Sequence, residues 1–327
     1  MSAYAGRKVL ITGAGGFIGS HLWSRLVEEG AQVGVLLRYS SLPPHQRFPQ
    51  KLLERTQVHR GDITDRDLLD RAMDGAEVVF HLAALVGIPY SYECPAETFR
   101  VNAGGALALL EAARSACPGR VVMTSTSEVY GSAQQVPMPE DHPLCAQSPY
   151  AASKIAADQL ALAWHRSFGT PVAVLRPFNT YGPGQSARAV IPTILGQALA
   201  GGPLKLGDTG TTRDFNFVDD TVEAFLAAGL RQEALGRVTP YGSGVESPLE
   251  EVVRLAARLV GRELSVEEDA RRLRPAQSEV TRLCCDPAPA RRILGVEARV
   301  GLEEGLARTL EWMRAQQGSH GAMDYNV

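Results

Sequence analysis

The sequence predicts a doubly wound α/β fold, a parallel sheet covered by helices on both faces, followed by a smaller C-terminal α/β lobe that binds substrate. Two observations predict this fold. Short apolar, β-branched runs alternate with helix-like stretches over the first half of the chain, and a glycine-rich turn follows the first run. The chain has 327 residues, 45% of them apolar and 21% charged, which is enough to bury a substantial core.

Strands and helices are expected to alternate along the first part of the chain. The strands are β-branched apolar runs, and the helices carry apolar residues at helical spacing. Strands are expected at 9–11, 32–37, just before 61, 78–82, 120–124 and 172–175, and helices at 18–29, 67–73, 103–115 and 151–166. Right-handed crossovers then make the strands parallel and place helices on both faces.

Beyond about Pro177 the alternation loosens into loops rich in glycine and proline. Helices are expected there at 190–200, 249–260 and 302–316, with a strand at 204–206. We expect a dinucleotide-binding domain over 1–176, to which later segments return, and a substrate-binding lobe over 177–317. The substrate would lie in the cleft between them, and 318–327 would form a flexible tail.

Composition excludes several classes of function. The net charge is −3 and the basic residues are scattered, so neither nucleic acid nor an anionic membrane is an expected partner. No apolar run resembles a signal peptide or a membrane span, which indicates a cytoplasmic protein. The five cysteines include no C-x-x-C pair, so no disulfide framework and no metal site are expected. The adjacent Cys284 and Cys285 are interpreted as small apolar residues in a strand.

A glycine-rich turn after the first strand predicts a dinucleotide site. Gly13, Gly16 and Gly19 have the Rossmann spacing, and Phe17 and Ile18 open the following helix. In this setting the backbone N–H groups at the helix N-terminus bind a pyrophosphate. The alternative is a turn whose glycines only close a tight corner between strand and helix.

Two further strand ends support a bound dinucleotide. Asp62 and Ile63 follow the third strand, where they would contact the adenine, and Leu82, Ala83 and Ala84 end the fourth strand with residues small enough for a ribose and pyrophosphate to approach. Each segment alone is equally compatible with an ordinary turn or strand end. In series along one sheet edge they favour the dinucleotide.

The end of the second strand bears on the choice between NAD and NADP. NAD enzymes usually place an acidic residue there, but this chain has Arg38 followed by Tyr39, Ser40 and Ser41. A guanidinium beside two hydroxyls suits the 2′-phosphate of NADP, so we predict NADP over NAD. The alternative is an arginine that stacks on the adenine of NAD.

The candidate catalytic residues follow the fifth strand and open the next helix. Thr126, Ser127 and Glu128 come first, and Tyr150 and Lys154 are four residues apart on one helix face. A nearby cation lowers the pKa of a phenol, so Tyr150 is expected to act as the base that takes an alcohol proton. The alternative for Glu128 is a carboxylate exposed to solvent at a strand end.

From Val9 to about Trp312 these motifs resemble the extended short-chain dehydrogenase/reductase family of nucleotide-sugar enzymes. The resemblance implies that Tyr150 is the base, that Lys154 holds the nicotinamide ribose, and that Thr126 hydrogen-bonds the 4-hydroxyl of the sugar. It also implies that Asn102 belongs to the supporting network of the active site.

Within this family, a carboxylate at position 128 indicates more than epimerisation. Oxidation at C4 makes the C5 proton acidic, so Glu128 would remove it, water would leave from C6, and a 4-keto-6-deoxy sugar would result. Dehydratases of the dTDP-glucose type have Asp-Glu here, whereas Ser127-Glu128 resembles the GDP-mannose type. Glu128 would then pass its proton to the C6 oxygen, with Ser127 positioning the leaving group.

The C-terminal half also resembles this family in its substrate-binding segments. The resemblance implies that Asn179 contacts the diphosphate of the substrate and that Arg213 and Arg274 clamp it with forked donors. The strings around Ile88, Gln147 and Arg188 resemble the nucleotide-activated N-acetylglucosamine 4,6-dehydratases of legionaminic-acid biosynthesis, which implies a GDP- or UDP-linked N-acetylglucosamine and a substrate contact at Arg188. The alternative for each arginine is a solvated surface residue.

Three other functions stay open at this point. A UDP-glucuronate decarboxylase and a nucleotide-sugar C4 epimerase would use the same Tyr150 and Lys154, and a dinucleotide-sensing binding protein would use the fold alone. The family resemblance also implies a homodimer that pairs through the helices at 103–115 and 151–166. Their apolar residues, such as Leu107 and Leu160, are equally able to pack on the sheet.

Overall fold

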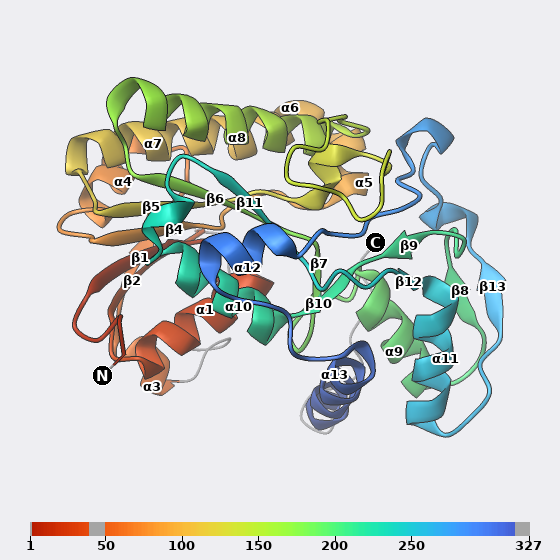
Figure 1. Cartoon of the computed structure of the whole chain (residues 1–327). Coiled ribbons are helices and arrows are strands. Elements are labelled where there is room, and N and C mark those ends of the chain that lie inside the picture. The colour runs from red at the N-terminus through yellow and green to blue at the C-terminus, as the bar shows by residue number, and fades with distance from the viewer. Residues whose placement is uncertain (1, 39–49, 318–327) are drawn as a thin grey trace.

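The structure is a computed structural model that describes residues 2–38 and 50–317 (Figure 1). The predicted hydroxyl partners of Arg38 at positions 40 and 41 and the predicted tail over 318–327 lie outside the described residues.

A seven-stranded parallel sheet forms the centre of the larger part, in the order β11-β6-β5-β4-β1-β2-β3. Every neighbouring pair in this sheet is parallel. The strands are β1 (Lys8–Thr12), β2 (Gln32–Leu37), β3 (Thr56–Arg60), β4 (Val78–His81), β5 (Arg120–Thr124), β6 (Val172–Pro177) and β11 (Val238–Tyr241). The predicted doubly wound α/β fold is therefore confirmed.

The apolar runs form strands because both of their faces are buried. In β1, Val9 and Ile11 pack into one hydrophobic core, whereas Leu10 between them packs into the core on the other face of the sheet. In β4, Val78 and Phe80 alternate with Val79 in the same way. Side chains that alternate between two dry faces give the continuous apolar runs typical of parallel strands.

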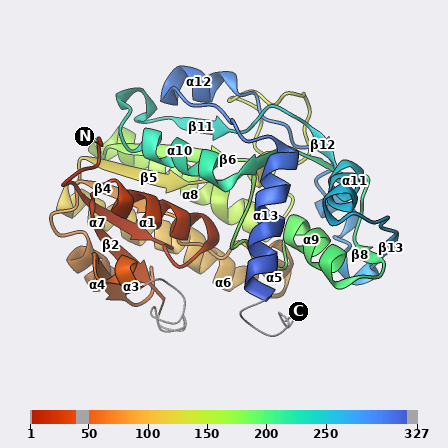
Figure 2. The same ribbon diagram turned by 90° about the horizontal axis from the view of Figure 1, so that it is seen from below.

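Helices cover both faces of this sheet (Figures 1 and 2). One layer contains α1 (Phe17–Glu28), α10 (Val218–Ala228) and α12 (Ala288–Leu294), whose apolar residues share a core with β1. The other contains α4 (Arg66–Ala72), α7 (Gly105–Ala116) and α8 (Pro149–Phe168). The short helices α3 (Gln50–Leu53), α5 (Ile88–Glu93) and α6 (Pro95–Phe99) connect strands on the way.

The C-terminal part combines small sheets with three helices. Its strand pairs are β10 (Phe215–Phe217) with β7 (Asn179–Tyr181), β12 (Ser247–Pro248) with β9 (Thr212–Arg213), and β13 (Val266–Glu268) with β8 (Leu204–Leu206). Its helices are α9 (Val190–Ala200), α11 (Leu249–Val260) and α13 (Leu302–Gln317). Short 3-10 turns lie at Gln232–Ala234, Ala270–Arg272 and Ala276–Ser278.

Three elements beyond residue 177 pack with the first domain. The sequence predicted that later segments would return to it, but it did not predict these elements individually. The strand β11 pairs with β6 at the sheet edge, and α10 and α12 pack on its face. The domain boundaries themselves stay a prediction. Cys284 and Cys285 are buried, as expected, but Cys285 forms an isolated bridge with Met138 and does not lie in a strand, so that detail was wrong.

Local capping places the catalytic helix. The Ser148 side chain accepts a hydrogen bond from the N–H of Ala151 at 3.1 Å, and Pro149 occupies the first turn of α8. Gly169 ends the helix in a left-handed conformation. Tyr150 is thereby held in the first turn, beside the carboxyl end of β5. No helix in the described ranges is long and apolar enough to cross a membrane.

Candidate active site

The glycine turn after β1 is built for close backbone approach. Gly13 has a φ of 76°, and a Cβ atom there would come within 2.5 Å of the backbone nitrogen of Ala83. A Cβ at Gly19 would overlap the carbonyl oxygen of Gly13. Only glycine fits both positions, because each brings two backbone segments into contact. At Gly16 the nearest atom would be 3.2 Å away, within the turn itself.

The N-terminus of α1 fits the pyrophosphate of a dinucleotide. Gly16 caps the helix without a side-chain hydrogen bond, and Phe17 and Ile18 form its first turn. Unsatisfied N–H groups and the helix dipole at such a terminus favour an anion. Leu82, Ala83 and Ala84 lie beside this turn and are half-buried, so the predicted cofactor residues of β1 and β4 are brought together.

A charged cluster marks the expected adenosine end. The Nε atom of Arg38 lies 3.9 Å from Oδ2 of Asp62, and Oδ1 of Asp62 accepts hydrogen bonds from the N–H and hydroxyl of Thr64. Burial acts to raise the pKa of Asp62, but the bonds from Thr64 and the nearby arginines outweigh it and lower the pKa. The side chain of Ile63 is instead buried against Gly105.

Tyr150 and Lys154 are buried together behind the end of β5. Their exposed fractions are 6% and 4%. The Nζ of Lys154 donates to the carbonyl of Thr124 at 2.5 Å, and a side-chain hydrogen bond joins Tyr150 to Thr126. Thr126 also caps the 3-10 turn η2 (Ser127–Tyr130) by accepting from the N–H of Glu128. The predicted catalytic residues therefore form one cluster.

The electrostatics of this cluster differ from the expectation for the phenol. Burial raises the pKa of Tyr150, and although the hydrogen bond with Thr126 acts to lower it, the net effect is an increase. Burial lowers the pKa of Lys154, with Asp158 opposing the change. Desolvation is thus the largest influence on the pKa of both groups. The pKa of the phenol rises, whereas the sequence argument predicted that the lysine would lower it.

Glu128 points into the same cluster and is not a solvated strand-end carboxylate. Its side chain is 12% exposed, and its Oε2 lies 3.6 Å from Nη1 of Arg274. Its charge also acts on Tyr150 and Arg213. Glu128 is therefore a partly buried carboxylate whose charge reaches the candidate base.

The two predicted clamp arginines meet at a carboxylate that the sequence argument did not single out. Arg213 donates from Nη2 to Oε1 of Glu279 at 3.4 Å, and Nη1 of Arg274 lies 3.8 Å from the same oxygen. Arg213 is 7% exposed, and burial lowers the pKa of its guanidinium. Two guanidinium groups held around one carboxylate are donors of the kind that suits an anionic group such as a diphosphate.

Other predicted residues lie at varying positions around this cluster. Asn179 begins β7, and its Oδ1 is buried without a hydrogen-bond partner. Arg188 is exposed just before α9. Asn102 is buried in a π-helical turn, η1 (Arg100–Gly104), where it bonds both backbone groups of Leu85 and the hydroxyl of Ser153. It thus ties the end of β4 to α8.

Hydrogen bonds that the sequence does not reveal hold the segment of Arg274 against one side of the cluster. Ser278 donates to the carbonyl of Gln147 and bonds the hydroxyl of Tyr92 at 2.5 Å, and the amide of Gln147 donates to the carbonyls of Gln277 and Glu279. These bonds join the segment 274–279 to the loop before Tyr150. Their partners are more than 100 residues apart in the chain, so periodicity cannot reveal them.

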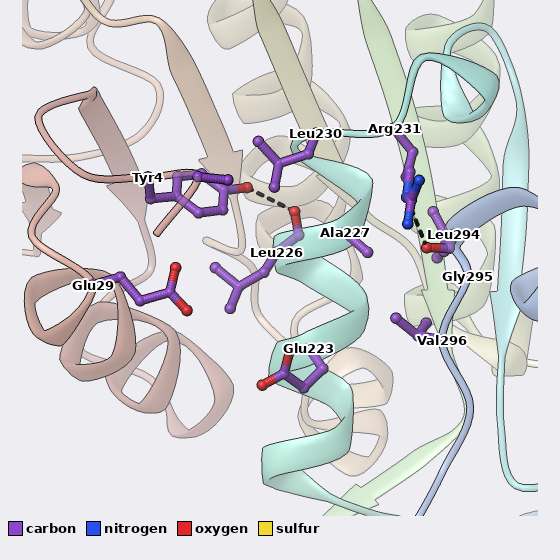
Figure 3. A pocket seen from close by; sticks show the side chains of 11 residues that line it. Tyr4, Glu29, Glu223, Leu226, Ala227, Leu230, Arg231, Leu294, Gly295 and Val296 are labelled. Atoms are coloured by element: carbon purple, nitrogen blue, oxygen red, sulfur yellow. Dashed lines mark hydrogen bonds between the residues drawn. The ribbon is translucent and has the colours of Figure 1, made fainter. Parts of the chain in front are cut away.

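A separate cavity of about 430 Å³ lies away from these residues (Figure 3). Among others, it is lined by Tyr4 before β1, Glu29 at the C-terminal cap of α1, Glu223 and Leu226 on α10, and Arg231 beyond the end of α10. None of the candidate catalytic residues lines it. Among residues 2–38 and 50–317, no group of three or more His, Cys, Asp or Glu side chains is arranged to hold a metal ion.

The glycine turn and the Tyr-Lys pair at one sheet edge define a dinucleotide-dependent sugar enzyme of the short-chain dehydrogenase type. A family model described as GDP-mannose 4,6 dehydratase matches residues 10–309. The chain belongs to this extended family of NAD-dependent nucleotide-sugar 4,6-dehydratases and 4-epimerases.

Known relatives include both 4-epimerases and 4,6-dehydratases. The chain is 36% identical to a UDP-glucose 4-epimerase of Mycolicibacterium smegmatis, over 94% of this chain and 98% of the relative. DesIV, a dTDP-glucose 4,6-dehydratase of Streptomyces venezuelae solved with NAD, is 32% identical with a TM-score of 0.88, covering 96% and 99%. MoeE5, solved with UDP-glucose and NAD, is 34% identical with a TM-score of 0.85, covering 95% and 99%.

Proposed function

We propose that the protein is a nucleotide-sugar 4,6-dehydratase that acts on GDP- or UDP-linked N-acetylglucosamine and gives a 4-keto-6-deoxy sugar. The observation that carries the proposal is the carboxylate of Glu128, which is only 12% exposed and whose charge acts on Tyr150. C4 epimerisation needs a group that moves the proton of the 4-hydroxyl, and it needs no second base. A partly buried carboxylate next to the redox site would supply that second base.

The first step is oxidation of the sugar at C4. Tyr150 acts as a phenolate that the charge of Lys154 stabilises, and it becomes a neutral phenol when it takes the proton of the 4-hydroxyl. Thr126 holds that hydroxyl, and Lys154 also holds the nicotinamide ribose. The bound dinucleotide supplies what these side chains lack, since it accepts a hydride from C4 and later returns one to C6.

The second step is the loss of water across C5 and C6. The 4-keto group makes the C5 proton acidic, Glu128 takes it, and the C6–O bond breaks. The protonated Glu128 then delivers a proton to the departing C6 oxygen, with the buried Ser127 positioning that group. Hydride return to C6 and protonation of C5, which restores the proton that Tyr150 took from the 4-hydroxyl, would complete a net loss of one water molecule.

The anionic part of the substrate would lie against the arginines. Arg213 and Arg274 would bind the diphosphate in place of part of their contact with Glu279, and Asn179 would add a contact from β7. Arg188, exposed just before α9, would add a further contact with the substrate.

NAD is the cofactor that we expect to co-purify with the protein. The NADP preference inferred from Arg38 has no support from the relatives, which hold NAD. The side chain of Arg38 also lies 3.9 Å from Asp62, so a carboxylate already balances part of its charge. Release of the bound dinucleotide by denaturation, followed by mass spectrometry, distinguishes the two cofactors directly.

A C4 epimerase is the second candidate, because a relative of that activity is 36% identical over nearly the whole chain. The test gives purified protein GDP- and UDP-N-acetylglucosamine, GDP-mannose and UDP-glucuronate separately. A product lighter by one water supports the dehydratase, and an unchanged mass with a new sugar configuration identifies the epimerase. Loss of carbon dioxide from UDP-glucuronate would identify a decarboxylase and overturn the proposal.

A further inference from the structure

A buried aspartate continues the catalytic face of α8. Tyr150, Lys154 and Asp158 follow one another at intervals of four residues, so all three lie on the same side of the helix. Asp158 is only 2% exposed. A buried carboxylate is costly unless charged or hydrogen-bonding partners surround it, so its neighbours indicate its role.

The Asp158 carboxylate joins α8 to the end of β5 and to β6. Its Oδ2 accepts from the hydroxyl of Ser125 at 2.6 Å and from Nη2 of Arg176 at 2.8 Å. The Nε of Arg176 also donates to Ser125 at 3.2 Å, and its guanidinium lies 4.5 Å from the ring centre of Tyr130. Ser125 directly precedes Thr126, so these bonds tie the Thr126-Glu128 segment to the helix of Tyr150.

Asp158 is also the buried anion shared by two buried cations. Arg176 forms a direct ion pair with the Asp158 carboxylate. The charge of this carboxylate also acts on Lys154, whose Nζ donates a hydrogen bond to a neutral carbonyl. The other titratable groups around this pair are His81 from β4, Tyr130 from η2 and Tyr150 from α8. Burial and the Lys154 charge lower the pKa of His81 to about 3, so His81 is neutral and adds no second cation.

We propose that Asp158 is a positioning residue of the redox site. Its carboxylate holds the positive charge of Lys154 in the interior and, through Ser125, fixes the Thr126-Glu128 segment against Tyr150. This inference rests on the proposed function only for the role of Tyr150 and Lys154 in C4 oxidation, which dehydratases and epimerases share.

The first experiment measures the coupling without substrate. A double-mutant cycle uses Asp158→Asn, Lys154→Met and the double variant, with thermal unfolding of the full-length protein as the readout. Lys154→Met should be less destabilising in the Asp158→Asn background than in the parent. In that background Lys154 is a buried cation without its carboxylate partner, so its removal costs less. We expect non-additivity of roughly 2–4 °C in Tm. Additive shifts would overturn the proposed charge balance.

The second experiment measures C4 oxidation as reduction of bound NAD, with any nucleotide sugar that the parent oxidises. Asp158→Asn should lower the rate roughly ten- to a hundred-fold with little change in KM. Without the carboxylate, the pKa of Lys154 falls further, so the alkaline loss of rate should move to lower pH. Asp158→Glu should restore the parent profile in part. An unmoved pH profile would contradict the proposal.

Two further variants separate positioning from folding. Asp220→Asn removes another buried carboxylate, which accepts from the N–H groups of Arg299 and Val300, and should leave the pH profile unchanged. Ser125→Ala keeps the Asp158–Arg176 pair and should lower the rate without moving the pH profile. If Ser125→Ala reacts at the parent rate, the hydrogen bond from Ser125 to Asp158 does not position the Thr126-Glu128 segment. If the parent oxidises no nucleotide sugar, the proposed function fails, while the double-mutant cycle still decides the coupling.

Discussion

Glu128 and Tyr150 reach the site from different elements, and their environments explain their proposed roles. Tyr150 is buried, so desolvation raises its pKa in spite of the hydrogen bond with Thr126. The guanidinium of Arg274 lies 3.6 Å from the Glu128 carboxylate, and the Glu128 side chain is 12% exposed. The phenol is thus a proton donor and acceptor that is neutral at rest, whereas the carboxylate is a base placed near a cation.

Replacement of Glu128 tests the second base directly. Glu128→Gln keeps the size and removes the charge, so C4 oxidation should persist while water loss slows by about 10²- to 10⁴-fold. The measurement is product mass against time, alongside the absorbance of reduced nicotinamide. Glu140→Gln is the matched control, because Glu140 also pairs with an arginine, Arg292, but at the surface. Dehydration by Glu128→Gln at the parent rate would refute the assignment.

The glycine turn offers a test with a control at the same backbone angle. Gly13 and Gly6 have φ values of 76° and 79°, but only at Gly13 would a Cβ meet another backbone segment. Gly6→Ala should cost about 1–2 kcal/mol of unfolding free energy from the left-handed conformation alone. Gly13→Ala should cost clearly more and should abolish dinucleotide binding. Equal losses in denaturant unfolding, with cofactor retained in both, would contradict this account of the turn.

The helix α8 shows how one element assembles chemistry from local signals. The Ser148 cap and Pro149 start it, and its spacing aligns Tyr150, Lys154 and Asp158. These features are local in the sequence, so the helix and its catalytic face were predicted. The π-helical turn around Asn102 was not, because its backbone is selected by bonds to Leu85 and Ser153 from other elements.

The segment that carries Arg274 and Glu279 is held by a pH-sensitive ion pair. Glu246 accepts hydrogen bonds from Nε and Nη2 of Arg282, both at 2.7 Å, and also binds Thr212. The bond with Arg282 is the largest influence, and the pKa of Glu246 falls from 4.5 to about 2. A lowered carboxylate pKa contributes stability above the unfolded value, and this contribution is lost as the pH falls through the folded value.

Glu246→Gln should therefore destabilise the protein only where the pair is charged. We expect its Tm to lie below that of the parent above pH 4.5, with the difference shrinking as the pH falls toward about 2. Thermal unfolding across this range provides the measurement, with Glu140→Gln as a surface control. A pH-independent difference would show that packing, and not the ion pair, holds the segment.

Across the whole molecule, long-range pairing decides how the two parts meet. The strand β11 returns from the C-terminal part to complete the sheet, and Arg213 and Arg274 arrive beside Glu128 from segments 85 or more residues further along the chain. The helices α7 and α8 were predicted to pair in a homodimer. Leu110 and Ala157 pack on the sheet, and Leu160 and Leu162 pack partly against the same core. Leu107 is only half-buried.

The homodimer stays a prediction with a direct test. Phe99, at the end of α6 beside α8, is 51% exposed, so a charge placed there would disturb a contact made through this helical layer. Sedimentation should give a species of two chains, and Phe99→Glu should shift it toward the monomer. Val266→Glu, at a 44% exposed position on β13, should leave it unchanged. A monomeric parent would contradict the prediction.

The sequence alone determined the alternation of strands and helices, the glycine turn, and the face of α8 that carries Tyr150 and Lys154. These follow from the periods of 2 and 3.6 residues and from turn chemistry, which act over a few neighbouring residues. Only the tertiary structure decided that Glu128 lies beside Arg274, that Glu279 joins two arginines, and that Asp158 pairs with Arg176 in the interior. Burial and charge depend on contacts between distant segments, and no local pattern contains them.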